Sequence, residues 1–412
     1  MQTEDIVVVG GGQAGGEAVA ALRTAGFEGG ITLVGEEPQL PYSRPPLSKD
    51  FLLGEVGTEV LLLRPPHFYE KHLVRTLLGR TVTKLDRDRR TLTLDDGDSL
   101  RYNTLILATG GTARRLRDPV AEAAPNIHYI RTIADIKRLR PGLVPGARLA
   151  VIGGGYVGLE IAAVGRKLGL DVTVVEAAPR LLARAAGPEI SAFVHRVHTE
   201  EGVDIRLGTT VTGFVPGDDG RVTAAVLDDG TKVDADVVVV GIGLVPRDRL
   251  AADAGIEVAD GIVVDEFCRT SDEAVYAIGD CTRHPCAEHG GTRRLESVQN
   301  ASEQARVAAA AITQNRRAYT SVPWFWSDQY DLKLRSVGIA AGCDRTVVRG
   351  SLDEGRSAAV FYLKAGQVRA AEVVSSPRDF GAAKKLVANR AEIAPERLAD
   401  VSTPLKDLLT SR

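Results

Sequence analysis

The chain has 412 residues, which is enough for two or three domains with sizeable apolar cores. Its formal net charge of −3 predicts no broad basic surface for nucleic acid. Four cysteines are too few for a disulfide scaffold, and the seven histidines lack metal-ligand spacing, so no metal site is predicted. The N-terminus lacks the basic region of a signal peptide, and no apolar run approaches the roughly 18 residues of a spanning helix, which predicts a cytoplasmic protein.

The first 36 residues follow the order of a dinucleotide-binding unit. An apolar, β-branched run at 6–9 predicts a buried strand, apolar residues at helical spacing follow it, and a second strand is predicted at 31–34. The pattern G-x-G-x-x-G lies between the first strand and the helix and consists of Gly10, Gly12 and Gly15. These glycines permit a tight turn, close approach of a pyrophosphate and close helix–strand packing, in that order. Glu36 follows the second strand, where a carboxylate can accept hydrogen bonds from ribose hydroxyls.

A proline-rich loop at 41–49 reads P-Y-S-R-P-P-L-S-K. Its composition leaves two interpretations open: a solvated loop leading to a helix near 49–53, or a rigid wall against a flat ligand with Lys49 aimed inward. Antiparallel strands are predicted within 81–94. A buried strand is predicted within 102–111, which would return to the first sheet and bring Thr109 and Gly110 near the dinucleotide.

The opening pattern recurs in the middle of the chain. A strand predicted at 148–152 is followed by Gly153, Gly155 and Gly158, a helix, and a strand at 171–175 that ends in Glu176. A second fingerprint predicts a second dinucleotide site. Glu176 would repel a 2′-phosphate, and no arginine directly follows it, so we predict a preference for NADH over NADPH.

From residue 263 the pattern predicts a return to the first domain. A strand over 274–279 precedes Asp280, and ligands of open parallel sheets bind beyond the carboxyl ends of the strands. Asp280 can therefore accept hydrogen bonds from a bound ligand, or act only as a cap or turn residue. A long helix is predicted from 296–298 onward. From Pro323 the composition changes to short alternating strands at 332–337, 346–349, 358–363 and 368–374, followed by helical stretches at 380–389 and 405–409, which predicts a smaller α+β domain.

Taken together, these residues resemble the FAD-dependent, NADH-linked ferredoxin reductases of the putidaredoxin reductase type. The resemblance spans nearly the whole chain and includes both glycine fingerprints and the proline loop. Further matching motifs are A-T-G at 108–110, A-I-G-D at 277–280, L-E-S-V-Q-N-A at 295–301 and W-F-W-S-D-Q-Y at 324–330.

The resemblance implies an α/β fold of the glutathione reductase type, with two Rossmann-like dinucleotide-binding domains and a C-terminal α+β domain. The implied boundaries are 1–113 for the first part of the FAD-binding domain, 114–241 for the NAD-binding domain, 242–320 for the second part of the FAD-binding domain, and 321–412 for a C-terminal interface domain. A monomer is expected.

By matching position, the resemblance also implies the site residues. Contacts with FAD are expected from Gly10, Gly12, Gln13, Ala14, Gly15, Glu36, Arg44, Lys49, Val82, Ala108, Thr109, Gly110, Asp280, Val298 and Trp326. Contacts with NAD are expected from Gly153, Gly155, Tyr156, Val157, Gly158, Glu160, Glu176 and Gly243. Glu160 matches the acid beside the nicotinamide and Lys49 its ion-pair partner near flavin N5, so these two are the expected catalytic residues. Trp326 either lies near the flavin or packs in a core.

The implied activity is hydride transfer from NADH to FAD, followed by release of single electrons to a two-iron two-sulfur ferredoxin that serves a cytochrome P-450 or another oxygenase. Such ferredoxins are acidic, and Arg306, Lys384 and Lys406 match positions that could meet one, although each could equally be an ordinary solvated cation. Rubredoxin reductase, monodehydroascorbate reductase and a flavin-bound signalling protein of the apoptosis-inducing-factor type are the alternatives.

The cysteines bear on a further alternative. Disulfide reductases of this fold carry a cysteine pair soon after the first fingerprint, and residues 27–63 contain no cysteine. Cys281 and Cys286 have the spacing C-x-x-x-x-C but follow Gly279-Asp280, toward the ribityl and phosphate end of the predicted flavin site. We therefore interpret them as reduced structural thiols.

Overall fold

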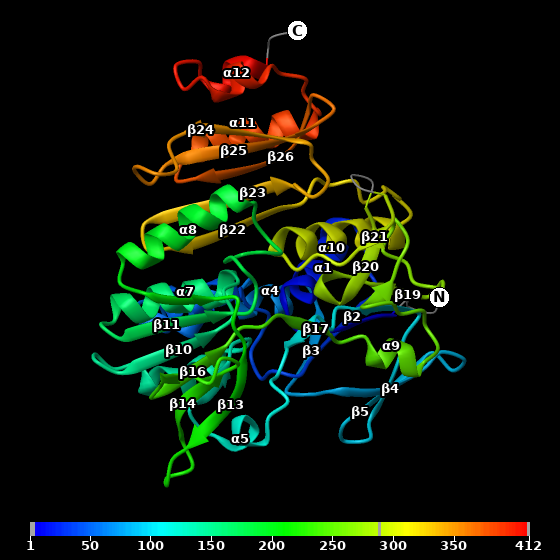
Figure 1. Cartoon of the computed structure of the whole chain (residues 1–412). Coiled ribbons are helices and arrows are strands. Elements are labelled where there is room, and N and C mark those ends of the chain that lie inside the picture. Colours follow the sequence, from blue (N-terminus) through cyan, green and yellow to red (C-terminus); the bar gives the residue numbers. More distant parts are fainter. Residues whose placement is uncertain (1–4, 287–289, 410–412) are drawn as a thin grey trace. The chain divides into compact units, whose positions relative to one another are not determined.

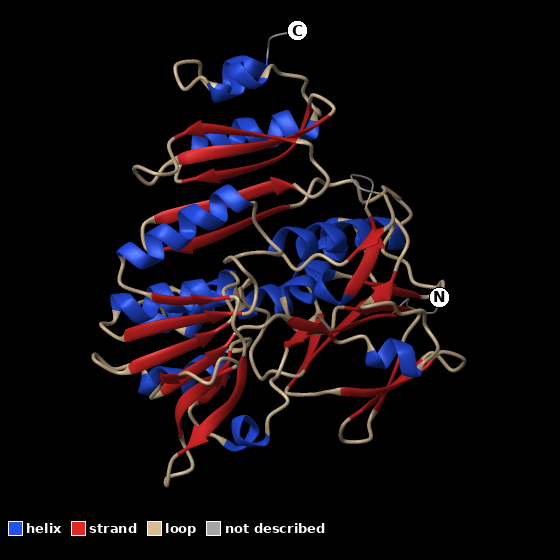
Figure 2. Cartoon of the chain, viewed as in Figure 1, coloured by secondary structure: helices blue, strands red, loops and turns tan. Residues whose placement is uncertain are grey.

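The computed structural model describes residues 5–286 and 290–409, whose helices and strands are drawn in Figures 1 and 2. By their contacts, these residues divide into two compact units. The first unit comprises Met1–Arg44, Thr58–Thr112 and Leu244–Ser321, and the second Pro45–Gly57, Ala113–Gly243 and Val322–Arg412. Each unit is therefore assembled from three separate stretches of chain. Within the described residues, no helix combines the length and the apolar composition that crossing a bilayer requires.

A five-stranded parallel sheet organises the first unit, with the strand order β19-β7-β1-β2-β3. Its strands are β1 (Asp5–Val9), β2 (Gly30–Gly35), β3 (Val74–Leu78), β7 (Thr104–Leu107) and β19 (Val275–Ala277). Residues 6–9 of β1 are all buried, because both faces of the sheet are covered. Ile6 and Val8 pack toward helices α1 (Gln13–Thr24) and α10 (Val298–Ile312), whereas Val7 and Val9 pack toward a second, antiparallel layer.

That second layer is the sheet of β4 (Val82–Asp86), β5 (Thr91–Leu94) and β6 (Ser99–Arg101). A small sheet of β18 (Ile262–Val263), β20 (Thr282–Pro285) and β21 (Thr292–Arg293) also belongs to this unit. The short helices of the unit are α3 (Thr58–Leu61), α4 (Pro66–Lys71), α9 (Arg249–Asp253) and the 3-10 turn η3 (Gly279–Cys281). Strands β8 (Gly111–Ala113) and β17 (Leu244–Pro246) stand where the chain passes from one unit to the other.

A second five-stranded parallel sheet, with the order β12-β11-β10-β16-β9, lies in the second unit. Its strands are β9 (Ile127–Tyr129), β10 (Arg148–Ile152), β11 (Asp171–Glu176), β12 (Asp204–Leu207) and β16 (Val237–Val240). One face packs against the antiparallel strands β13 (Val211–Pro216), β14 (Val222–Leu227) and β15 (Lys232–Asp234). Helix α7 (Tyr156–Lys167) packs on β10 and β11, and α6 (Ile133–Leu139) packs on β9. The small elements η1 (Pro45–Ser48), α2 (Asp50–Leu53), α5 (Pro119–Ala123) and η2 (Arg140–Gly142) complete this part.

The C-terminal part of the second unit is an antiparallel sheet with the order β22-β23-β26-β25-β24. Its strands are β22 (Trp324–Gln329), β23 (Leu332–Gly338), β24 (Arg345–Gly350), β25 (Ala358–Lys364) and β26 (Gln367–Val374). One face packs against α11 (Pro377–Ala388), α12 (Pro395–Ala399) and the 3-10 helix η4 (Leu405–Leu409). Helix α8 (Pro188–Glu200) bonds to the sheet through Gly187, at its start, and through His198, and it lies along β22 and β23 in Figure 1.

The predicted fold class is confirmed by this architecture of two parallel sheets and an antiparallel C-terminal sheet. The predicted strand over 274–279 is too long, since β19 ends at Ala277. Gly279, at φ +81°, turns the chain and packs against Ala14, so that Asp280 lies in the 3-10 turn. The helical stretch expected at 405–409 is a 3-10 helix, and α11 begins at Pro377 rather than near Phe380. The expected domain boundaries stay predictions.

Candidate nucleotide sites and the buried pair Lys49–Glu160

The two glycine fingerprints have the same local geometry. Gly10 and Gly153 have φ of +124° and +111°, and a Cβ on either would meet a backbone carbonyl oxygen, Ala108 O at 2.0 Å or Gly241 O at 2.5 Å. Gly15 and Gly158 each contact the preceding turn, where a Cβ would lie 1.9 Å and 2.1 Å from a carbonyl oxygen. The first and third glycines of each fingerprint are therefore required by packing within the protein.

The middle glycines face open space instead. A Cβ on Gly12 would meet only Arg44, at 3.8 Å, and a Cβ on Gly155 would meet nothing within 4 Å. Each is the N-cap of a 12-residue helix, α1 or α7, and neither helix has an acidic residue in its first turn. Backbone N–H groups at such helix starts, with the positive end of the helix dipole, suit a phosphate group. We call each glycine turn, together with the helix N-terminus that follows it, a cradle. Both cradles thus fit a dinucleotide.

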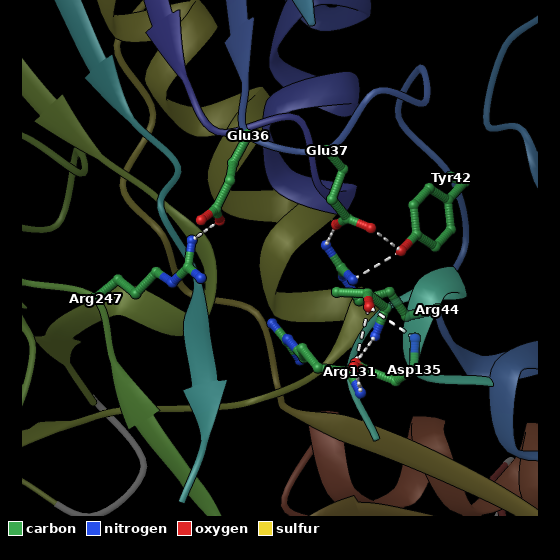
Figure 3. A network of polar contacts seen from close by, with 8 residues as sticks. Glu36, Glu37, Tyr42, Arg44, Arg131, Asp135 and Arg247 are labelled. Atoms are coloured by element: carbon green, nitrogen blue, oxygen red, sulfur yellow. Dashed lines mark hydrogen bonds and ion pairs between the residues drawn. The ribbon is translucent and has the colours of Figure 1, made fainter. Parts of the chain in front are cut away.

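Around the first fingerprint, acidic and basic side chains form a network in the first unit (Figure 3). Glu36, at the end of β2, is paired with Arg247. Arg44 donates to Glu37 at 2.7 Å, and Tyr42 donates to the other oxygen of Glu37 at 2.5 Å. Burial lowers the pKa of Arg44, but the neighbouring acidic groups of Tyr42, Glu37 and Asp280 more than offset this effect and raise that pKa. Arg44 is therefore a fixed cation near Gly12.

The other residues expected at FAD divide between the two units. Gln13 and Ala14 start α1, Ala108, Thr109 and Gly110 follow β7, Val82 begins β4, and Val298 begins α10, all in the first unit. Thr109 donates to the carbonyl of Arg247 at 2.6 Å. Lys49 and Trp326 belong to the second unit, where Trp326 stacks at 5.5 Å on Trp324. Their contacts with FAD stay predictions.

The second fingerprint holds Glu176 through the backbone. Its Oε2 accepts from Gly154 N at 2.6 Å, and its Oε1 accepts from Ala178 N at 2.7 Å. The carboxylate is therefore held as an acceptor-only group at the end of β11. Tyr156 and Val157 begin α7, and Tyr156 packs on Phe325 with ring centroids 4.7 Å apart. Gly243 follows β16 at φ +110°, with Arg184 3.3 Å from where its Cβ would be.

Glu160 is the most enclosed charged group of the second unit's candidate site. It lies on α7 with a relative exposure of 5%. Lys49 Nζ is 2.7 Å from its Oε2, Ser48 donates to the same oxygen at 2.5 Å, and Ser327 donates to Oε1 at 2.5 Å. A buried carboxylate is tolerated when it is paired and hydrogen-bonded in this way. The roles of Lys49 and Glu160 beside a nicotinamide stay a prediction.

The sequence analysis did not include Ser48 or Ser327 among the site residues. Both belong to motifs that it quoted, P-P-L-S-K and W-F-W-S-D-Q-Y. It also missed Arg247, the partner of Glu36, for which we find no sequence signal. The two cysteines singled out, Cys281 and Cys286, are buried and free. Cys281 Sγ lies 3.3 Å from the carbonyl oxygen of Ile278, and burial raises the pKa of its thiol.

Comparison with known proteins is consistent with this geometry. Residues 4–305 match the pyridine nucleotide-disulphide oxidoreductase family, and residues 324–409 match the reductase C-terminal family. The chain belongs to the pyridine nucleotide-disulphide oxidoreductases. It is 46% identical to rhodocoxin reductase of Rhodococcus erythropolis over 97% of this chain and 93% of that protein.

Two solved structures are similar over nearly their full length. The reductase in the covalent putidaredoxin reductase–putidaredoxin complex has a TM-score of 0.95 and 43% identity, covering 98% of each chain. The ferredoxin reductase for the CYP199A2 system of Rhodopseudomonas palustris has a TM-score of 0.95 and 40% identity, covering 99% of this chain and 100% of that one. The predicted enzyme class, a ferredoxin reductase, is confirmed by these relatives.

Proposed function

We propose that this reductase uses FAD in the first unit and NADH in the second, and passes electrons singly to a two-iron two-sulfur ferredoxin that serves a cytochrome P-450 or a related oxygenase. The observation that carries the proposal is the pair of cradles, each with an open central glycine at a bare helix N-terminus. A bound flavin would supply uptake of a hydride and release of its two electrons one at a time.

The protein's own residues would supply position and charge. Gly12 and the N-terminus of α1 would bind the FAD pyrophosphate, and Glu36 would accept from its ribose hydroxyls. Gly155 and the start of α7 would do the same for NADH, with Glu176 at its ribose. Glu160, fixed by Lys49 and two serines, would orient the nicotinamide carboxamide by accepting a hydrogen bond.

A visible spectrum tests the cofactor part of the proposal. Purified protein should show a bound oxidised flavin that NADH bleaches under anaerobic conditions, and it should reduce ferricyanide with NADH. Colourless protein that FAD cannot reconstitute would overturn the assignment. Flavin that is bound but not reduced by NADH would overturn the nicotinamide half alone.

The partner is a two-iron two-sulfur ferredoxin by the same proposal, supported by the solved complex of a relative with putidaredoxin. Arg306, Lys384 and Lys406 are exposed, and Lys384 Nζ lies 4.7 Å from the centre of the Trp324 ring. Reversing all three charges should slow cytochrome c reduction through added ferredoxin while leaving NADH–ferricyanide reduction unchanged.

A matched control keeps the net charge equal. Lys84, Lys232 and Lys364 are also exposed, and reversing them changes the net charge by the same amount. Equal slowing in both triple variants would indicate a general charge effect and not a docking surface, because long-range attraction depends on total charge.

A further inference from the structure

A chain of buried polar side chains runs from Glu160 through the C-terminal sheet to α8, all within the second unit. Ser327 Oγ donates to Glu160 Oε1 at 2.5 Å, and Gln329 Nε2 donates to Ser327 Oγ at 3.1 Å. His198 Nε2 lies 2.8 Å from Gln329 Oε1, and the hydroxyl of Tyr330 lies 3.2 Å from His198 Nδ1. Ser327, Gln329 and His198 are each at most 1% exposed.

The chemistry of these groups gives the chain a direction. A carboxylate only accepts, so Ser327 must donate its proton to Glu160 and accept from Gln329. The amide oxygen of Gln329 then faces His198, so the Nε2 atom of the imidazole must carry the proton. Nδ1 of the same ring is left as an acceptor for the hydroxyl of Tyr330. Each donor points toward the negative charge on Glu160.

Two further observations support a neutral, fixed His198. Burial lowers its pKa to about 4, so near neutral pH the ring carries one proton, which can occupy only one nitrogen. Tyr330 is the first residue of the two-residue turn between β22 and β23 and has φ +54°, an uncommon conformation for a bulky side chain. Its ring packs edge-on against the His198 ring, with the centroids 5.0 Å apart. The contact with α8 therefore stabilises a tyrosine in a backbone conformation that the turn alone would not favour for this residue type.

We propose that Ser327, Gln329, His198 and Tyr330 are positioning residues that orient the carboxylate of Glu160, and that the tautomer of His198 reports the charge of Glu160. The catalytic consequence rests on the proposed function of Glu160 beside the nicotinamide. The predicted tautomer of His198 does not depend on the proposed function, because it follows from the hydrogen bonds among these side chains.

Neutralising Glu160 should reverse the direction of donation in each hydrogen bond of this row of side chains. In Glu160→Gln the amide oxygen faces the Lys49 ammonium and the Ser48 hydroxyl, because the amide N–H₂ cannot accept from a cation. The amide nitrogen then donates to Ser327, Ser327 donates to Gln329, and the turned amide of Gln329 donates to His198 Nε2. The imidazole proton moves to Nδ1 and is donated to the oxygen of Tyr330.

The test is ¹⁵N NMR of the histidine ring nitrogens in the holoprotein with its flavin oxidised. Wild type should show His198 protonated at Nε2, and Glu160→Gln should show it protonated at Nδ1. In a Ser327→Ala background the chain is cut, so adding Glu160→Gln should leave the tautomer unchanged. The same tautomer in wild type and Glu160→Gln, a doubly protonated ring at neutral pH, or a switch that persists without Ser327 would each overturn the proposal.

A kinetic measurement tests positioning separately. Ser327→Ala should slow flavin reduction by saturating NADH roughly tenfold with little change in the NADH concentration at half-saturation, because orientation rather than binding is lost. Asp328→Asn, on the same strand and paired with Lys333, is the control and should keep the wild-type rate. An unchanged rate in Ser327→Ala would overturn the positioning role. Failure of NADH to reduce wild-type flavin would instead overturn the proposed function and leave the NMR result standing.

Discussion

The carboxylate of Glu176 accepts a hydrogen bond from the backbone N–H of Gly154 at 2.6 Å, across the first turn of the second fingerprint. Together with the bond from Ala178 N, this fixes a negative charge beside the open cradle of Gly155. A ribose 2′-hydroxyl can donate to that carboxylate, whereas a 2′-phosphate would meet a like charge.

Cofactor choice should therefore favour NADH, and steady-state kinetics with both nucleotides will measure it. Glu176→Gln keeps an acceptor for Gly154 but removes the charge, so it should raise kcat/KM for NADPH about tenfold or more. The value for NADH should change much less. Equal kcat/KM for the two nucleotides in wild type would contradict the prediction.

The central glycines should separate ligand binding from folding. Gly12→Ala has room within the protein and a favourable φ of −90°, so the melting temperature should stay near wild type while bound flavin falls, as absorbance will show. Gly10→Ala is the contrasting variant, since its Cβ would lie 2.0 Å from Ala108 O at φ +124°. It should lower the melting temperature or prevent folding. Full flavin content in Gly12→Ala would argue against this cradle.

Lys49 balances the charge of Glu160, which is only 5% exposed, so removing the lysine should lower the stability of the folded protein. Lys49→Met should destabilise the protein by roughly 3 kcal/mol, because breaking a buried pair leaves a charge without its partner. Adding Glu160→Gln should recover much of that loss, since the unpaired charge is then gone. Denaturant unfolding of both variants measures this. Equal stability of the single and double variants would indicate that the pair is not energetically coupled.

Cys281 and Cys286 should be dispensable for electron transfer. Burial raises the pKa of the Cys281 thiol, which keeps it protonated and a poor nucleophile. The double variant Cys281→Ser, Cys286→Ser should keep NADH-dependent flavin reduction at the wild-type rate, measured by stopped flow. Loss of turnover in a correctly folded double variant would instead support the alternative in which Cys281 and Cys286 act as a redox-active pair.

Glu372 should make the protein less stable as pH rises. Burial raises the pKa of its carboxyl group above the usual 4.5, despite hydrogen bonds from Tyr362 and from Gly187 N. The folded protein thus binds a proton that the unfolded chain has released, and stability falls from pH 4.5 upward until the folded carboxyl also ionises. The stability of Glu372→Gln should not fall in this way. Its free energy of unfolding, measured with denaturant, should therefore rise relative to that of wild type as pH increases. Glu354→Gln, at an exposed site, should follow the wild-type curve.

Local patterns predicted much of this molecule. The fingerprints at Gly10 and Gly153 were readable because turn, helix and strand chemistry repeats over about 30 residues. The surroundings of Glu160 were not readable in that way. Ser48 and Ser327 lie 112 and 167 residues from it in sequence, and no local period connects them. Likewise, the apolar spacing of α8 could have revealed a helix, but not that its His198 would meet Gln329 on β22.

The pairing of β19 with β7 has a consequence for how the polypeptide emerges from the ribosome. The parallel sheet of the second unit can be complete once residue 240 is made, whereas the parallel sheet begun by residue 5 waits for residue 277. During that interval the edge of β7 is open to unwanted partners. Of the two parallel sheets, we expect the one that starts first to finish last, and nascent chains halted before residue 275 to be the ones that most need a chaperone.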